Sequence, residues 1–207
     1  MKGLLLKDFY MAVKYCRIFL FVILIFSAVS FSDKGMGFFS TFPVLMAGML
    51  PVTLLSYDEK EKWHIYSGTF PYSRAQIVSS KYVFGLLVTL AALAFSAAVL
   101  AVRLNLSGSF KGIEFLSSVA GMFTAGLIGS ALVLPFIFKL GAEKGRIMYF
   151  VVIIAIFGLG TALESIKMET GFALGPITLL AVTTIGTVVV YAASWLMSIS
   201  FYQKRDL

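Results

Sequence analysis

Residues 82–102 read YVFGLLVTLAALAFSAAVLAV, an uncharged run bounded by Lys81 and Arg103. A bilayer core about 30 Å thick is crossed by roughly 20 apolar residues in a helix, so this run is long enough to span a membrane. It is continuous and does not alternate between polar and apolar residues, which favours a helix over a barrel strand. Similar runs recur at 15–32, 37–56, 115–138, 147–163 and 175–201. We therefore predict an all-α membrane protein with six transmembrane helices.

The composition agrees with a membrane protein and indicates its orientation. Only 13% of the 207 residues are charged and the mean hydropathy is +0.95, whereas a soluble domain has roughly 25% charged residues. With six spans, the side that holds the N-terminus carries thirteen basic and six acidic residues, and the other side carries four of each. Short cytoplasmic loops accumulate Lys and Arg, so both termini are predicted to be cytoplasmic. The net charge of +7 is then a topology signal, and no nucleic-acid partner is expected.

Residues 1–14 are predicted to form an amphipathic helix at the membrane interface. Leu5, Phe9 and Val13 recur at every fourth position and would make one apolar stripe. Basic side chains for lipid head groups accompany the stripe at Lys2, Lys7 and Lys14. The alternative is a plain basic flank of an uncleaved first span. Cys16 is the only cysteine, so the chain can form neither an intrachain disulfide nor a cysteine cluster for a metal.

Prolines and small residues inside the spans indicate how the helices bend and pack. Pro43 and Pro51 in the second span and Pro135 in the fourth are expected to loosen the helix locally or to adapt it to its neighbours. The fourth span also has small residues at helical spacing that permit the close approach of another helix: Gly121, Ala125, Gly126, Gly129 and Ser130. Whether that helix belongs to the same subunit or to a second one is left open.

Several kinds of chemistry are missing from the sequence. No ionisable residue lies within the six predicted span interiors, which argues against proton coupling but leaves Na⁺ binding by backbone carbonyls open. His64 is the only histidine, and neither HExxH nor a Walker A motif is present; residues 141–146, GAEKGR, lack the Gly-Lys-Ser/Thr ending. We therefore expect a non-catalytic chain without a cofactor of its own. If it transports, a partner must supply the energy.

The segment 57–81 is the longest charged connection on the predicted cytoplasmic side. Its first part, YDEKEKWHIYSG (57–68), is predicted to continue the second span as a helix with Trp63, Tyr66 and Phe70 on one face and a stop at Gly68. Pro71 then opens a second helical element, 73–82, which runs into the third span. One interpretation is an interfacial aromatic belt. The other is a rigid knob that fills a groove of a soluble partner, with charged residues at its rim.

This arrangement resembles a small ABC-2-type permease, the membrane subunit of an ABC exporter whose ATPase is a separate chain. The resemblance is carried by the entry helix, six spans with both ends inside, residues Asp58–Tyr66, and the Pro71-Tyr72-Ser73-Arg74 opening. It implies one transmembrane domain over 1–207 in a cell membrane, typically bacterial. It also implies a second permease copy or related permease, and two cytoplasmic ATPase subunits that bind ATP and Mg²⁺. Residues of the 57–81 segment would contact the ATPase: Glu59, Lys60, Glu61, Lys62, Trp63, His64, Tyr66 and Arg74.

The expected cargo is amphipathic or hydrophobic, such as a short peptide or a lipid-like drug. By size, the chain is most similar to a Gram-positive subgroup that includes phenol-soluble-modulin and other peptide exporters. Phe39, Phe42, Met46 and Met49 are candidate cargo contacts, with helix packing or lipid contact as the alternative for each. Two other functions stay open: a membrane scaffold that binds a cytoplasmic partner through 57–81 without transport, and a small carrier with carbonyl-based ion sites.

Overall fold

The described part of the protein is built from α-helices. The structure is a computed structural model that describes residues 2–15, 17–32, 37–63, 66, 71–108, 110–141 and 175–204. The helices with assigned bounds are α1 (Lys2–Tyr15), α2 (Arg17–Ser32), α3 (Gly37–Lys60), α5 (Arg74–Leu106), α6 (Gly112–Leu140) and α8 (Pro176–Gln203). The all-α prediction is therefore confirmed for these residues.

Four of the described helices are long and apolar enough to cross a membrane. They correspond to the second, third, fourth and sixth predicted spans: Phe39–Lys60, Arg74–Leu106, Gly112–Leu140 and Leu180–Gln203. The first predicted span is helix α2, which has 16 residues and is thus about 24 Å long, short of a hydrocarbon core of about 30 Å. The predicted span 147–163 lies outside the described residues.

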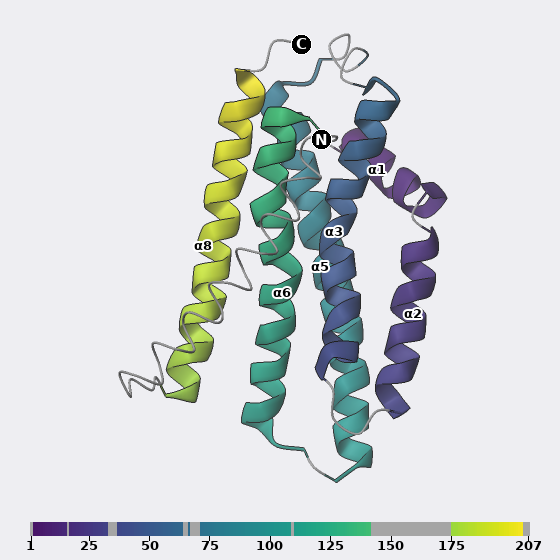
Figure 1. Ribbon diagram of the computed structural model, residues 1–207, viewed down its shortest axis with the longest axis vertical. Helices are drawn as coiled ribbons and strands as arrows, with labels where there is room; N and C mark the ends of the chain where they lie inside the picture. Colours follow the sequence, from purple (N-terminus) through teal and green to yellow (C-terminus); the bar gives the residue numbers. More distant parts are fainter. Residues whose placement is uncertain are drawn as a thin grey trace.

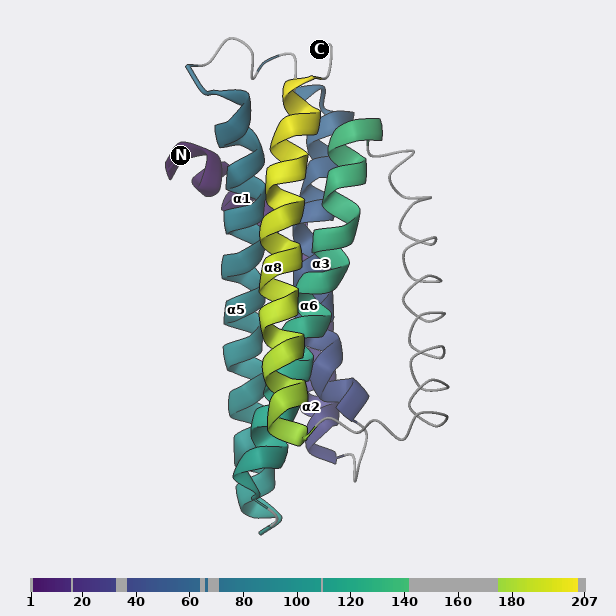
Figure 2. The ribbon, with the colours of Figure 1, turned by 90° about the vertical axis from the view of Figure 1, so that its left-hand side faces the viewer.

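The long helices run side by side, and α1 lies across them near one end (Figure 1 and Figure 2). α6 and α8 run in the same direction, since Thr124 contacts Thr187 at one level and Phe138 contacts Tyr202 at another. α5 and α8 run in opposite directions. As a result, α6 ends and α8 begins at opposite ends of the bundle (Figure 1).

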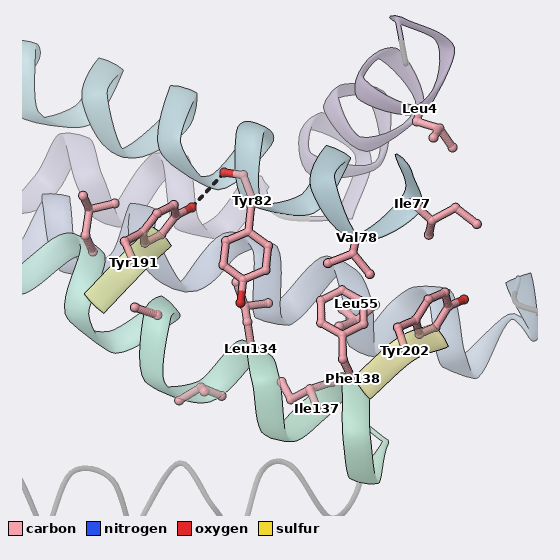
Figure 3. Close-up of a cluster of buried hydrophobic side chains, with 13 residues drawn as sticks. Leu4, Leu55, Ile77, Val78, Tyr82, Leu134, Ile137, Phe138, Tyr191 and Tyr202 are labelled. Carbon is pink, nitrogen blue, oxygen red and sulfur yellow. Dashed lines mark hydrogen bonds between the residues drawn. The ribbon is translucent and has the colours of Figure 1, made fainter. Parts of the chain in front are cut away.

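The best-packed core lies at the end of the bundle near α1. Its buried side chains come mainly from α3, α5, α6 and α8 and include Leu55, Val78, Tyr82, Leu134 and Phe138. Figure 3 shows these residues converging between the helices. By contrast, large apolar side chains on α2 and α8 point outward; Ile18 is 74% exposed and Leu196 is 70% exposed. These outer surfaces suit contact with lipid.

Helices α3 and α6 approach one another at a pair of glycines. A Cβ atom placed on Gly48 would lie 1.9 Å from the carbonyl oxygen of Gly126. A Cβ on Gly126 would lie 2.8 Å from side-chain carbons of Thr89 and Val44. The small residues of the fourth predicted span thus meet a helix of the same chain at Gly126. Pro43 and Pro51 lie inside α3 without interrupting it.

Helix α1 has the predicted bounds but buries a different face. Phe9 is 56% exposed and Val13 is 39% exposed, whereas Leu4 and Asp8 are buried against the bundle. Of the predicted apolar stripe, Leu5 packs against the core, whereas Phe9 and Val13 remain outside it and available to the membrane. The buried face is set by Asp8, whose partners are described below.

Candidate functional site

The connection between α3 and α5 begins with a break in the helix. α3 ends at Lys60, and the chain turns through hydrogen bonds from the Glu61 amide to the Tyr57 carbonyl and from the Lys62 amide to the Glu59 carbonyl. Lys62 has a φ of 55°, a left-handed conformation that an α-helix cannot contain. The predicted uninterrupted helix over 58–68 is therefore wrong at this point, although Trp63 and Tyr66 are themselves helical.

The two described aromatic residues of this segment have different surroundings. Trp63 is half-buried and packs against the core, and the Lys7 ammonium lies 4.3 Å from its ring centroid. Tyr66 is 60% exposed. The two aromatic residues are therefore not equivalent, contrary to what the predicted stripe implied: Trp63 packs against the bundle and Tyr66 is exposed. His64 and Phe70 lie outside the described residues.

The charged residues around the turn are mostly accessible. Lys60, Glu61 and Lys62 are exposed, and Glu59 is half-buried. The connection thus has charged residues of both signs and one exposed aromatic residue, Tyr66, within eight positions of the sequence. This mixed surface has the composition of a protein contact, in which an aromatic anchor is surrounded by polar groups.

Behind the turn, four charged side chains from three helices form a compact cluster. The Lys81 ammonium of α5 lies 2.6 Å from a carboxylate oxygen of Asp8 on α1 and 2.6 Å from one of Asp58 on α3. Lys7 of α1 donates a hydrogen bond to the other carboxylate oxygen of Asp58 at 2.7 Å. Lys81 and Asp8 are 2% and 1% exposed, and Asp58 is also buried. We call these four residues the charge cluster.

The charge cluster is electrically balanced but strongly desolvated. Its two ammonium groups face two carboxylates, so each buried charge has a partner of opposite sign. Burial lowers the pKa of Lys7, and the neighbouring Lys81 lowers it further, while Asp58 and Asp8 oppose the shift. A cavity of about 30 Å³ bounded by Asp58, Trp63 and Lys81 adjoins the cluster and is large enough for a water molecule.

The start of α5 is anchored by a different set of contacts. Ser73 caps the helix: its hydroxyl accepts from the Gln76 amide, and the Gln76 side chain accepts from the Ser73 amide. Arg74, predicted to contact an ATPase, donates to the carbonyl of Gln203 at the end of α8, 2.9 Å away. The predicted helical element after Pro71 is thus confirmed, and it runs without a break into the third span.

A second buried polar network begins at Tyr82, the residue after Lys81. The hydroxyl of Tyr82, next to Lys81, lies 2.7 Å from Ser194 and 2.6 Å from Ser198 on α8. Ser194 in turn donates to the carbonyl of Ala131 on α6. Tyr191 donates to the carbonyl of Tyr82 at 2.8 Å, as Figure 3 shows. Helices α5, α6 and α8 are therefore linked by hydrogen bonds directly below the connection.

The candidate cargo contacts on α3 lie between helices. Phe39 and Phe42 pack on the ring of Phe26 in α2, with centroid distances of 5.8 Å and 4.2 Å. Met49 packs beside Gly129 of α6, and Met46 is half-buried. The described conformation thus uses at least three of the four side chains for packing.

Sequence reasoning missed the charge cluster. α3 and α5 extend beyond the predicted span ends, so that Asp58 and Lys81 lie within the membrane-spanning helices and not in a solvated linker. One signal was available. Asp8 follows Leu4 by one helical turn, away from the apolar stripe of the same helix, and is the only acidic residue among the basic residues of the first 17 positions. Such an isolated acid needs a cation, but its partner is 73 positions away.

The profile of a family described as "ABC-2 family transporter protein" matches residues 3–203. No curated protein matches the sequence. Within the described residues, no group of three His, Cys, Asp or Glu side chains could hold a metal ion.

Proposed function

We propose that this chain, which belongs to the ABC-2 family of transporter proteins, is the permease subunit of an ATP-driven exporter. Permeases of this family generally work with an ATPase subunit. In our proposal two ATPase subunits bind ATP and Mg²⁺, and this chain has no catalytic role. It would pair with a second copy or a related permease in a bacterial cell membrane. The cargo would be an amphipathic peptide or a lipid-like compound.

The ATPase would dock on the turn between α3 and α5. The observation that carries this proposal is the exposed Tyr66, which follows the exposed Lys60, Glu61 and Lys62 in the connection after α3. An aromatic side chain with an accessible charged rim fits a groove in a soluble partner. Arg74 would act mainly by holding α5 against α8, because its guanidinium already bonds to the end of that helix. His64, which lies outside the described residues, stays a candidate contact.

The charge cluster would transmit the movement of the ATPase. Asp58 is two residues before the end of α3, and Lys81 connects it to Asp8 of α1. Trp63 follows the turn and contacts Lys7 of the same cluster. Because breaking these buried pairs is costly, a push on the turn would move α1, α3 and α5 together.

The cargo would pass along α3 when that group of helices moves. Phe39 and Phe42 pack on α2 in the described conformation, so separating α2 from α3 would free both rings. Met46 and Met49 follow along the same helix and provide adaptable apolar contacts. This part of the proposal agrees with the apolar character of the expected cargo.

The docking surface is tested by Tyr66→Ala, with Tyr10→Ala as the matched control. Both residues are exposed tyrosines, 60% and 65%, but Tyr10 belongs to α1 and not to the connection between α3 and α5. Tyr66→Ala should strongly reduce the ATPase recovered when the tagged chain is purified from native membranes, because a central aromatic anchor is lost. Tyr10→Ala should retain it.

Equal recovery with both variants would contradict docking at Tyr66. If the unchanged chain itself brings down no ATPase, while another cytoplasmic protein depends on Tyr66, the chain acts as a membrane scaffold. Mass spectrometry of the purified complex distinguishes these results.

A further inference from the structure

An apolar groove runs beneath α1, on the outside of the bundle. Its volume is about 690 Å³, and α1, α3 and α5 form its walls. The lining from α1 includes Leu5, Phe9 and Val13, the stripe that the sequence predicts for the membrane interface. Several lining side chains are open to the surroundings; Phe9 is 56% exposed and Leu87 is 55% exposed. The groove is therefore not filled by the chain's own core.

The groove has one charged residue, at Lys2. This residue is exposed, and no ion-pair partner for it occurs in the described part of the chain. The other cation of α1 near the bundle, Lys7, is held by Asp58. Lys2 therefore leaves a positive charge at a groove whose other walls are apolar, which complements a ligand with one anionic end and an apolar body.

The depth of the groove relative to the membrane identifies that ligand further. Asp8 of α1 pairs with Lys81 of α5, so α1 lies at the same end of the bundle as the charge cluster. The α5 wall continues from Phe84 to Ala91. Ala91 is ten residues beyond Lys81, about 15 Å further along a helix. The groove thus joins a cation at the charged end of the bundle, where lipid head groups lie, to an apolar wall that extends along α5 toward its middle.

We propose that this groove binds an anionic phospholipid of the adjacent leaflet, with its phosphate at Lys2 and an acyl chain along Leu87 and Ala91 of α5. The chain alone provides the whole site, so lipid binding does not depend on transport or on an ATPase. A bound lipid would fill the space between α1 and the spanning helices. It would thereby support α1 from the side opposite to the charge cluster.

The test measures which lipid stays on the purified chain. The full chain is reconstituted in vesicles of phosphatidylcholine and phosphatidylglycerol in equal amounts, and retained lipid is identified by native mass spectrometry. The unchanged chain should retain phosphatidylglycerol preferentially. Lys2→Gln should reduce this preference about fivefold, as expected for ~1 kcal/mol per basic residue near an anionic surface. Lys2→Arg should preserve it.

Two matched tryptophan substitutions on α5 test the apolar wall. Ala91→Trp fills the groove and should release the lipid, whereas Ala98→Trp should not, because Ala98 is equally an exposed alanine of α5 but does not line the groove. Both positions are on the surface, and thermal unfolding of each variant checks that the bundle is intact.

Three results would overturn the proposal. One is retention of phosphatidylglycerol by Ala91→Trp equal to that of the unchanged chain. Another is equal retention of the two lipids by the unchanged chain. The third is loss of a dimer by Ala91→Trp with no change in lipid, which would assign the groove to a second copy of this chain.

Discussion

At the scale of single residues, the charge cluster explains where α1 lies. Removing Lys81 and Asp8 from water costs several kcal/mol per ion, and this cost is offset only when the charges stay paired. Each helix contributes a charge that the other two helices neutralise. One oxygen of Asp8 has no hydrogen-bond partner within the described residues, so this carboxylate depends on the ammonium beside its other oxygen. The cluster therefore favours one register of α1 against α3 and α5.

Lys81→Met should be strongly destabilising. It leaves Lys7 as the one cation for two buried carboxylates, 2.7 Å from Asp58 and 3.6 Å from Asp8, so we expect a loss of about 3–5 kcal/mol in the free energy of unfolding. The double substitution Asp8→Asn, Lys81→Met should recover part of this loss. It removes one positive and one negative charge together and leaves the ion pair between Lys7 and Asp58, 2.7 Å apart, whose charges balance. Denaturant unfolding in lipid nanodiscs measures the difference.

The control for this experiment is Lys111→Met. Lys111 pairs with Glu114, but the two side chains are 72% and 67% exposed, so the substitution should leave unfolding essentially unchanged. A Lys81→Met chain as stable as the unchanged one would contradict the structural role of the cluster. So would a double variant less stable than Lys81→Met.

At the scale of helices, the contact between α3 and α6 depends on two glycines. Gly48→Ala should cost more than Gly126→Ala, because the new methyl at position 48 would lie 1.9 Å from a backbone oxygen, whereas the nearest atoms to a methyl at position 126 are side-chain carbons 2.8 Å away, a smaller overlap. Overpacking of this kind costs about 1–3 kcal/mol. Gly121→Ala on α6 is the matched control: a Cβ there meets nothing within 4 Å, so helix propensity should stabilise it by up to about 1 kcal/mol.

Thermal unfolding of the three glycine variants, each in the same lipid mixture, gives the order of stability. If Gly48→Ala were as stable as Gly121→Ala, α3 and α6 would have to lie further apart than in the structure.

Some features of the helices could be predicted from the sequence and others could not. The spanning helices α3, α5, α6 and α8 were predictable because each contains a long apolar run without charge. The end of α3 was not, because nothing in the composition of 57–68 marks the left-handed Lys62. The burial of Asp8 could not be predicted from the sequence for another reason. Local periodicity describes an isolated helix, whereas the partner Lys81 is brought near only by the packed bundle.

At the scale of the whole molecule, basic residues mark one end of the bundle. The ends of α3 and α8 and the starts of α2 and α5 lie at the end nearest α1 (Figure 1), and basic side chains there include Lys60 and Arg74. The opposite end, where α5 connects to α6, has Arg103 and Lys111. Because cytoplasmic loops are enriched in Lys and Arg, the α1 end is predicted to face the cytoplasm.

Single cysteines at the two ends test this orientation in intact cells. Cys16→Ser removes the one native thiol, and Lys60→Cys or Lys111→Cys then places a thiol at an exposed position of either end. A membrane-impermeant maleimide added outside should label Lys111→Cys and spare Lys60→Cys until the cells are opened, since the reagent cannot cross the bilayer. Labelling of Lys60→Cys from outside would invert the orientation. It would also place the proposed docking surface beyond the reach of a cytoplasmic ATPase, so this one measurement bears on topology and function together.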